Sequence, residues 1–260
     1  MTMGKGNGVR IKLGVVAVPV LILLVWQVSA NLFSYLFLPT PLKTFSVLKA
    51  GLGWSGWLLS DLKDTMVELA VGYLFAVVLG LAVGFVLGMN RLLREVMEPF
   101  VLNVYAIPKV TLFPIFLFIF GLGMESKIAF GFFHGIFPII ILTMGAMKDI
   151  RNIYLKVGRS FRLNPLQMFN EIVFPSTLPA VMTGLRLGFN LSFIGVILGE
   201  MAASKSGLGY ALMKSEGAFY IEKIICIVVV LAVIAVAVNY LYYAVEGRLV
   251  RAHGRPGLQY

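Results

Sequence analysis

TMVELAVGYLFAVVLGLAVGFVLGM, residues 65–89, is an almost unbroken apolar run that contains a single charged residue, Glu68. The run is long enough to cross the roughly 30 Å hydrocarbon core of a bilayer as a helix. A helix is expected because lipid offers no partners to an open backbone, and the run lacks the strict alternation of a barrel strand. The sequence therefore predicts a membrane-spanning helix here.

Five further apolar runs have similar lengths, at about 11–30, 104–121, 127–147, 178–203 and 222–246. The chain of 260 residues is 59% hydrophobic and 13% charged, whereas an average soluble domain is about 45–50% apolar and about 25% charged. We therefore predict an all-α integral membrane protein, a single transmembrane domain over residues 1–260 with six membrane-spanning helices.

Lys and Arg residues are more frequent in alternate connecting segments, and this bias predicts the orientation in the membrane. The segment 148–177 contains five of them, Lys148, Arg151, Lys156, Arg159 and Arg162. Both termini are therefore expected in the cytoplasm, and the basic charge is attributed to topology rather than to nucleic-acid binding. In an alternative interpretation the first run is a cleavable secretory signal, which would leave five spans.

Small residues recur along two of the predicted spans. In the second span they are Gly72, Ala76, Gly80, Gly84 and Gly88, and in the fifth they are Gly184, Gly188, Ser192, Gly195, Gly199 and Ala203. Such stripes allow helix backbones to approach closely. Two interpretations remain open: close packing inside one subunit, or a dimer interface or pore-lining face.

Sequence motifs for catalysis and metal binding are lacking. No G-x-x-x-x-G-K-[ST] phosphate loop and no G-x-S-x-G nucleophile turn occur. His134 and His253 are far apart, and the one cysteine, Cys226, allows neither an intrachain disulfide nor a cysteine-built metal site. We predict no catalytic site, no metal site and no cofactor in this chain, and interpret His134 as an interior histidine with satisfied polar atoms.

Three ionisable residues within the spans are candidates for a translocation path: Lys109, Arg186 and Glu200. Ionisable groups at membrane depth usually face a bundle interior or a watery path. Pro108 precedes Lys109 and predicts a broken helix there. The alternatives are that Lys109 and Arg186 extend toward the membrane interface, and that Glu200 caps or pairs locally.

The polar segment 148–177 separates the fourth span from the fifth. Apolar residues spaced by three and four predict an amphipathic helix over about 149–161. By composition alone, this helix suits the anionic surface of the inner leaflet.

A second short helix is predicted over about 165–171. Asn164 is expected as its N-cap, Pro165 as its first residue and Gln167 as the reciprocal capping partner. This helix is expected to end before Pro175, and the fifth span is expected to begin near Pro179.

The order of these motifs resembles the cytoplasmic EAA loop of ABC-importer permeases, most closely the nitrate/sulfonate/taurine type of binding-protein-dependent permease. The resemblance covers about residues 38–250. It is carried by Leu38-Pro39-Thr40-Pro41, Pro99, Ile107-Pro108-Lys109, Pro114, Phe120-Gly121-Leu122-Gly123, Phe137-Pro138, Arg159-Ser160-Phe161, Asn164-Pro165-Leu166-Gln167-Met168-Phe169, Ile172-Val173-Phe174-Pro175, Leu178-Pro179, Gly184-Leu185-Arg186, Glu200 and Gly207-Leu208-Gly209-Tyr210.

The resemblance implies a type I ABC-importer permease of the bacterial inner membrane. Two permeases, two copies or a pair of paralogues, form the pathway. Two separate ATPase subunits bind ATP and drive alternating access, and an extracytoplasmic binding protein delivers a small anion such as a sulfonate, taurine or nitrate. The residues implied in ATPase coupling are Arg159, Ser160, Phe161, Asn164, Pro165, Leu166, Gln167, Met168, Phe169, Glu171 and Pro175. Leu166, Met168 and Phe169 are expected to form the apolar anchor of a helix-in-groove contact.

The chain departs from the family pattern at two places. Lys156-Val157-Gly158 stands where the family usually has Glu-Ala-Ala, and Arg162 stands at the usual glycine. A glycine after a helix end adopts the left-handed conformation without strain, so arginine is expected to cost about 1 kcal/mol or to shift the break. The departure suggests altered docking geometry and a divergent ATPase partner.

Other functions compatible with the composition are an ion-coupled secondary transporter, a membrane scaffold, and an importer of a pyrimidine-like or aromatic compound. The first would require inverted repeats and a self-contained coupling-ion site, and the sequence indicates neither.

Overall fold

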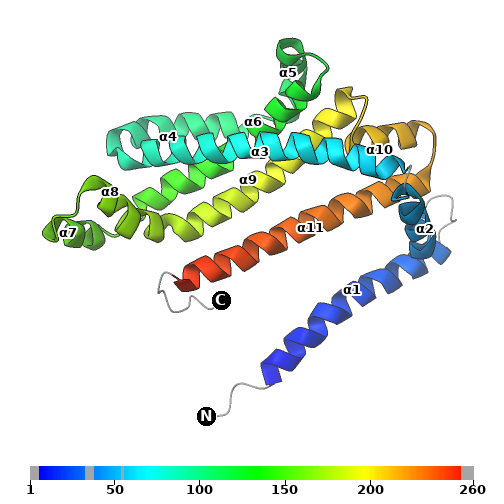
Figure 1. The fold of residues 1–260 in the computed structure, drawn as a ribbon, viewed down its shortest axis with the longest axis horizontal. Helices are drawn as coiled ribbons and strands as arrows, with labels where there is room; N and C mark the ends of the chain where they lie inside the picture. Colours follow the sequence, from blue (N-terminus) through cyan, green and yellow to red (C-terminus); the bar gives the residue numbers. More distant parts are fainter. Residues whose placement is uncertain (1–5, 33–37, 54–55, 253–260) are drawn as a thin grey trace. The chain divides into compact units, whose positions relative to one another are not determined.

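The computed structural model describes residues 6–32, 38–53 and 56–252, and every regular element within them is helical (Figure 1). The predicted all-α class is therefore confirmed. His253 and both chain ends lie outside the described residues. The chain groups into two compact units, residues 1–60 with 211–231 and residues 61–210 with 232–260.

The first unit contains α1 (Gly6–Leu32), α2 (Pro41–Gly51), most of α10 (Leu208–Gly217) and the start of α11 (Ile221–Ala252). Trp26 Nε1 donates a hydrogen bond to the Pro39 carbonyl at 3.0 Å. Lys43 Nζ lies 2.8 Å from the carboxylate of Glu222. These contacts connect segments that are far apart in the sequence.

The second unit contains the remaining helices. They are most of α3 (Trp57–Met89), α4 (Arg91–Ala106), the 3₁₀ helix η1 (Lys109–Leu112), α5 (Phe113–Phe120), α6 (Met124–Lys148), α7 (Asn152–Ser160), α8 (Pro165–Met168), the π-helical turn η2 (Phe169–Val173), α9 (Phe174–Ala203) and the end of α11. In Figure 1, α7 and α8 lie at one end of this group, and α5 lies at the other.

The small residues of α3 pack directly against α6. A Cβ added at Gly72 would lie 2.8 Å from the carbonyl oxygen of Ile128, and one at Gly84 would lie 2.7 Å from Thr143 Cβ. A side chain at either position would push the two helices apart.

The stripe on α9 packs against the same helix. A Cβ at Gly188 would lie 2.9 Å from the Gly135 carbonyl oxygen, and one at Gly195 would lie 3.0 Å from the His134 ring. Helix α6 is therefore held between α3 and α9. For these glycines, close packing inside one subunit is confirmed.

Four helical segments have the length and hydropathy of membrane spans: Trp57–Met89, Met124–Lys148, Pro165–Ala203 and Ile221–Leu249. A fifth is obtained if the bent pair Arg91–Ala106 and Lys109–Phe120 counts as one span. The apolar stretch Ala17–Leu32 forms the later part of α1. The total of six spans stays a prediction.

The third predicted span, 104–121, is wrong in where its helix begins, whereas the predicted break at Pro108 is present. Helix begins at Arg91, after the single N-cap residue Asn90, and the segments before and after Ile107-Pro108 meet at 84°. Ile107 has extended backbone angles, φ −61° and ψ 134°. This break follows from Pro108, which disfavours the helical conformation of the residue before it.

The capping of α8 is as predicted. The backbone N–H of Gln167 donates to Asn164 Oδ1 at 2.8 Å, and the Asn164 N–H donates to Gln167 Oε1 at 3.0 Å. The predicted end before Pro175 is wrong, because η2 continues α8 into α9 and gives one helix over Pro165–Ala203. The wider π turn places Pro175 in the first turn of α9, where a missing N–H is tolerated.

Candidate functional site

The turn between α7 and α8 is built around Arg162. The Leu163 N–H donates to the Gly158 carbonyl at 3.1 Å, and the Arg162 N–H donates to the Arg159 carbonyl at 2.9 Å. These two bonds form a Schellman motif, in which the residue after the C-cap is left-handed. Arg162 has φ +57°, so an arginine occupies the conformation that normally favours glycine, and the break stays where the family pattern has it.

Gly158 allows α7 to cross closely over the following segment. It is buried, and an added Cβ would lie 2.6 Å from Ile172 Cδ1 and 2.7 Å from Met168 Sδ. Gly158 therefore does not replace the missing turn glycine, but it sets the distance between α7 and the α8–η2 segment.

Exposed apolar side chains occur along α7 and at the start of α8. Phe161 is 76% exposed and Leu166 is 70% exposed, and Ile153 and Val157 continue the surface along α7 at intervals of four residues. We call these four residues the apolar coupling face. Exposed apolar surface of this kind, surrounded by charged side chains, is typical of a protein-binding site.

Two of the three predicted anchor residues are directed into the protein instead. The Phe169 ring lies 5.2 Å from the ring of Phe85 on α3, and Met168 lies against Gly158. Leu166 alone of the three is exposed. Sequence periodicity could not reveal this, because the π turn rotates Phe169 relative to a regular helix.

The remaining predicted coupling residues have varied surroundings. The Ser160 hydroxyl donates to the Lys156 carbonyl at 3.1 Å. Glu171 is exposed and lines a hollow of about 310 Å³ with Tyr154 and Ser176. Arg159 is exposed on α7.

The three candidate path residues are not in contact with one another. Lys109 Nζ donates to the Tyr105 carbonyl at 2.9 Å and lies 4.2 Å from the centre of the Tyr105 ring. Arg186 is half-buried, and within the described ranges its side chain makes no hydrogen bond or ion pair. Glu200 lies fourteen residues further along the same helix, about 21 Å away at 1.5 Å per residue.

Two sets of side-chain hydrogen bonds involve residues of α9 that are close to Arg186 in the sequence, Leu185 and Asn190. The hydroxyl of Tyr73 donates to the Leu185 carbonyl at 3.0 Å and lies 2.5 Å from the hydroxyl of Tyr242. One turn away, the amides of Asn190 and Asn239 form a reciprocal pair at 2.7 and 3.3 Å. These half-buried groups connect α3, α9 and α11 through polar contacts.

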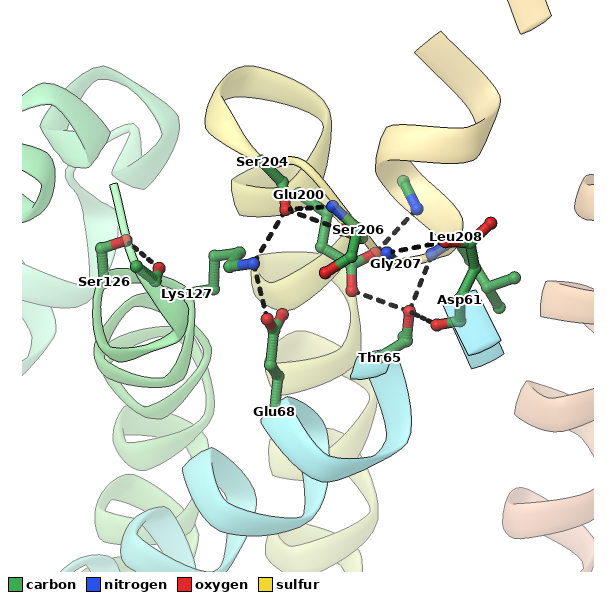
Figure 2. Close-up of polar contacts among 12 residues, drawn as sticks. Asp61, Thr65, Glu68, Ser126, Lys127, Glu200, Ser204, Ser206, Gly207 and Leu208 are labelled. Atoms are coloured by element: carbon green, nitrogen blue, oxygen red, sulfur yellow. Dashed lines mark hydrogen bonds and ion pairs between the residues drawn. The ribbon is translucent and has the colours of Figure 1, made fainter. Parts of the chain in front are cut away.

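A buried charge cluster lies at the opposite end of the second unit from α7 and α8, and Figure 2 shows its members. Lys127 Nζ lies 2.6 Å from Glu68 Oε1 and donates to Ser204 Oγ at 2.8 Å. Glu68 and Glu200 are 0% exposed and Lys127 is 4% exposed. Lys127 is the first residue of the predicted span 127–147, and its pairing with Glu68 was not predicted. Glu68, the single charged residue of the apolar run 65–89, was the available signal.

Glu200 connects the segment that follows α9 to α3 through hydrogen bonds. Its carboxyl group lies 2.7 Å from Thr65 Oγ1 and accepts a hydrogen bond of 2.7 Å from the Gly209 N–H. The Leu208 N–H donates to the same Thr65 oxygen at 2.8 Å (Figure 2). The Gly207-Leu208-Gly209 motif is thus held by side chains of both α3 and α9.

Gly207 is required by its conformation and by its surroundings. Its φ is +100°, and a Cβ there would overlap the Glu200 carboxyl group. Its N–H donates to Asp61 Oδ1 at 3.2 Å. Across the part of the chain that the structure describes, no group of three His, Cys, Asp or Glu residues has a metal-binding arrangement.

Comparison with known proteins adds three findings. A family model described as "Binding-protein-dependent transport system inner membrane component" matches residues 76–252. The putative aliphatic sulfonates transport permease SsuC of Bacillus subtilis is 26% identical over 235 residues, which cover 90% of this chain and 85% of SsuC. The nitrate import permease NrtB of Synechococcus elongatus is 28% identical over 78% of this chain and 76% of NrtB.

Among solved structures, the fold is similar to that of a chain of the MetNI methionine ABC transporter in an inward-facing conformation. The TM-score is 0.61 at 21% sequence identity, and the alignment covers 74% of this chain and 94% of that chain.

Proposed function

Since the chain belongs to the binding-protein-dependent transport system inner membrane components and is an ABC-importer permease, we propose that it carries a small anion such as a sulfonate, taurine or nitrate. The relatives SsuC and NrtB, whose names refer to aliphatic sulfonates and to nitrate, support this substrate class. The half-buried Arg186, which has no partner among the described side chains, is suited to an anion.

The single observation that carries the coupling mechanism is the exposed, capped α8 turn, which continues without a break into a membrane span. An ATPase binds the apolar coupling face, with Phe161 and Leu166 inserted into a groove on its surface. The Schellman motif at Arg162 and the capping box of Asn164 and Gln167 fix the backbone on both sides of the turn. The residues of this coupling region are Arg159, Ser160, Phe161, Asn164, Pro165, Leu166, Gln167, Met168, Phe169, Glu171 and Pro175.

The subunit arrangement follows from the same proposal. Two permease chains, identical or paralogous, form one pathway, and each binds one of two ATPase subunits, which bind the ATP. The α7–α8 end faces the cytoplasm together with both chain termini, as the excess of Lys and Arg in segment 148–177 favours. A soluble binding protein delivers the anion at the opposite face of the membrane.

Arg186 lines the translocation path, and the Tyr73–Tyr242 and Asn190–Asn239 pairs contact α9 at Leu185 and Asn190, close to Arg186 in the sequence. Lys109 contributes positive charge near the break at Pro108. Glu200 is enclosed in the buried charge cluster, so direct contact with a solute requires opening of the cluster during the transport cycle.

The test is uptake by liposomes that contain the permease with its ATPase and binding protein. We expect accumulation of a labelled sulfonate or nitrate that requires all three components and ATP. Uptake without ATPase and ATP would indicate a secondary transporter and contradict the coupling mechanism. ATP-dependent uptake of a pyrimidine, with no uptake of either anion, would contradict the substrate class alone.

A further inference from the structure

The buried charge cluster is unbalanced in charge. It contains two carboxyl groups, Glu68 and Glu200, but a single ammonium group, that of Lys127, and all three side chains are removed from solvent. A buried ion without a counter-ion is so costly that the group normally becomes neutral instead. Glu68 has a counter-ion, because Lys127 Nζ lies 2.6 Å from its Oε1.

Glu200 has no such counter-ion. Its hydrogen-bond contacts are the hydroxyl of Thr65 and the N–H of Gly209, both uncharged, and the carboxyl group of Glu68, which is itself acidic. The charged residues beside the network on α3 and in the loop after α9 do not supply one. Asp61 and Asp64 are acidic and half-buried, whereas Lys205 is exposed to solvent.

The hydrogen bonds around Thr65 identify where a neutralising proton lies. Thr65 Oγ1 has one hydrogen and two lone pairs. It lies 3.1 Å from the Asp61 carbonyl, which only accepts, and 2.8 Å from the Leu208 N–H, which only donates. The single hydrogen of Thr65 can be donated to the Asp61 carbonyl or to Glu200 Oε1, but not to both. When it is donated to the carbonyl and one lone pair accepts from the Leu208 N–H, the second lone pair faces Glu200.

Glu200 Oε1, at 2.7 Å, completes this arrangement when it donates a hydrogen bond to Thr65. A carboxylic acid has one donor oxygen and one acceptor oxygen. Glu200 Oε2 is the acceptor in this arrangement, since the Gly209 N–H donates to it at 2.7 Å. If Glu200 were ionised, both Glu200 and the Asp61 carbonyl would need the single hydrogen of Thr65, and one of these two contacts would lack a hydrogen.

We infer that Glu200 is a proton-binding site that is occupied in this conformation. The cluster then consists of an ion pair, Glu68 with Lys127, and a neutral carboxylic acid that ties the Gly207-Leu208-Gly209 loop to α3. This inference goes beyond the proposed function, because it concerns a bound proton and is independent of the solute and of the ATPase.

The test compares Glu200→Gln with Glu68→Gln in the purified full-length chain. A glutamine at 200 reproduces the protonated acid, with its amide N–H toward Thr65 and its oxygen toward Gly209. We expect its thermal unfolding midpoint to match the parent chain. A glutamine at 68 removes the counter-ion of Lys127, and we expect the midpoint to fall by at least about 5 °C. Glu216→Gln, on an exposed side chain, is the matched control and should leave the midpoint unchanged.

Infrared spectroscopy provides a second measurement that does not depend on stability. The parent chain should show the C=O stretch of a buried protonated carboxyl group, and Glu200→Gln should lack it. The inference is overturned if that band is absent from the parent or persists in Glu200→Gln. It is also overturned if Glu200→Gln lowers the midpoint as much as Glu68→Gln, or if neither variant lowers it.

Discussion

The N–H of Leu163 donates a 3.1 Å hydrogen bond to the carbonyl of Gly158, and this bond closes α7 with Arg162 in the left-handed conformation. The proposed coupling region therefore retains the geometry of a glycine turn without the glycine. The strain lies in the backbone of one exposed residue, so it can be relieved without changing any contact.

Replacing Arg162 with glycine should stabilise the chain by about 1 kcal/mol, because glycine adopts a positive φ at no steric cost. The measurement is thermal unfolding of the purified permease. Arg159→Gly is the matched control, since it makes the same chemical change within α7, and we expect it to destabilise by up to about 1 kcal/mol. Equal effects of the two variants would contradict the strain at Arg162.

The close approach of α6 and α9 predicts a difference between two glycines on α6. A Cβ at Gly135 would lie 2.7 Å from the Gly188 carbonyl oxygen, whereas Gly145 has no neighbour within 4 Å. Gly135→Ala should therefore destabilise by about 1–3 kcal/mol through overpacking, and Gly145→Ala should be neutral or slightly stabilising. Unfolding in detergent measures both, and a neutral Gly135→Ala would show that the helices separate freely.

The apolar coupling face predicts which substitutions uncouple the ATPase. Leu166→Asp places a charge on a side chain that is 70% exposed, so the permease should fold normally but lose its ATPase on purification. Phe169→Asp should instead lower the unfolding midpoint, because it removes the ring contact with Phe85. Retention of the ATPase by Leu166→Asp would contradict the docking surface.

The ion pair between Lys127 and Glu68 predicts a rescue. Lys127→Met leaves a buried carboxylate without its cation and should cost about 3–5 kcal/mol. The double variant Lys127→Met with Glu68→Gln should recover most of this loss, since no charge remains. The exposed pair of Arg91 and Glu95 is the control, and Glu95→Gln should cause no measurable change. Additive losses in the double variant would argue against a paired charge.

The anion path predicts that Arg186→Gln lowers ATP-dependent uptake about tenfold, through loss of charge-assisted hydrogen bonds to the solute. Arg186→Lys should retain part of the activity, because the charge remains while the planar fork is lost. ATPase binding should be unaffected in both variants. Unchanged uptake by Arg186→Gln would place the path elsewhere.

Local signals in the sequence predicted the elements that depend on neighbouring residues. The Asn164–Gln167 capping box and the break at Pro108 both follow from short-range chemistry, and the structure contains both. The pairing of Lys127 with Glu68 could not be predicted in this way, since the two residues belong to different helices and each looks like an isolated charge. The π turn was missed because an insertion of one residue per turn has no clear residue signature.

The continuity of Pro165–Ala203 has a mechanical consequence. Its 39 residues form a rod about 58 Å long, with Leu166 near one tip and Glu200 near the other. Leu166 is therefore connected to Glu200 by continuous helix rather than by a loop, and the π turn with Pro175 and Pro179 is where this helix has weaker backbone hydrogen bonding. The glycines of α9 are in close contact with α6, so a displacement of α9 also displaces α6. A displacement of the docking end would therefore also displace Glu200 and the Gly207-Leu208-Gly209 loop that it holds.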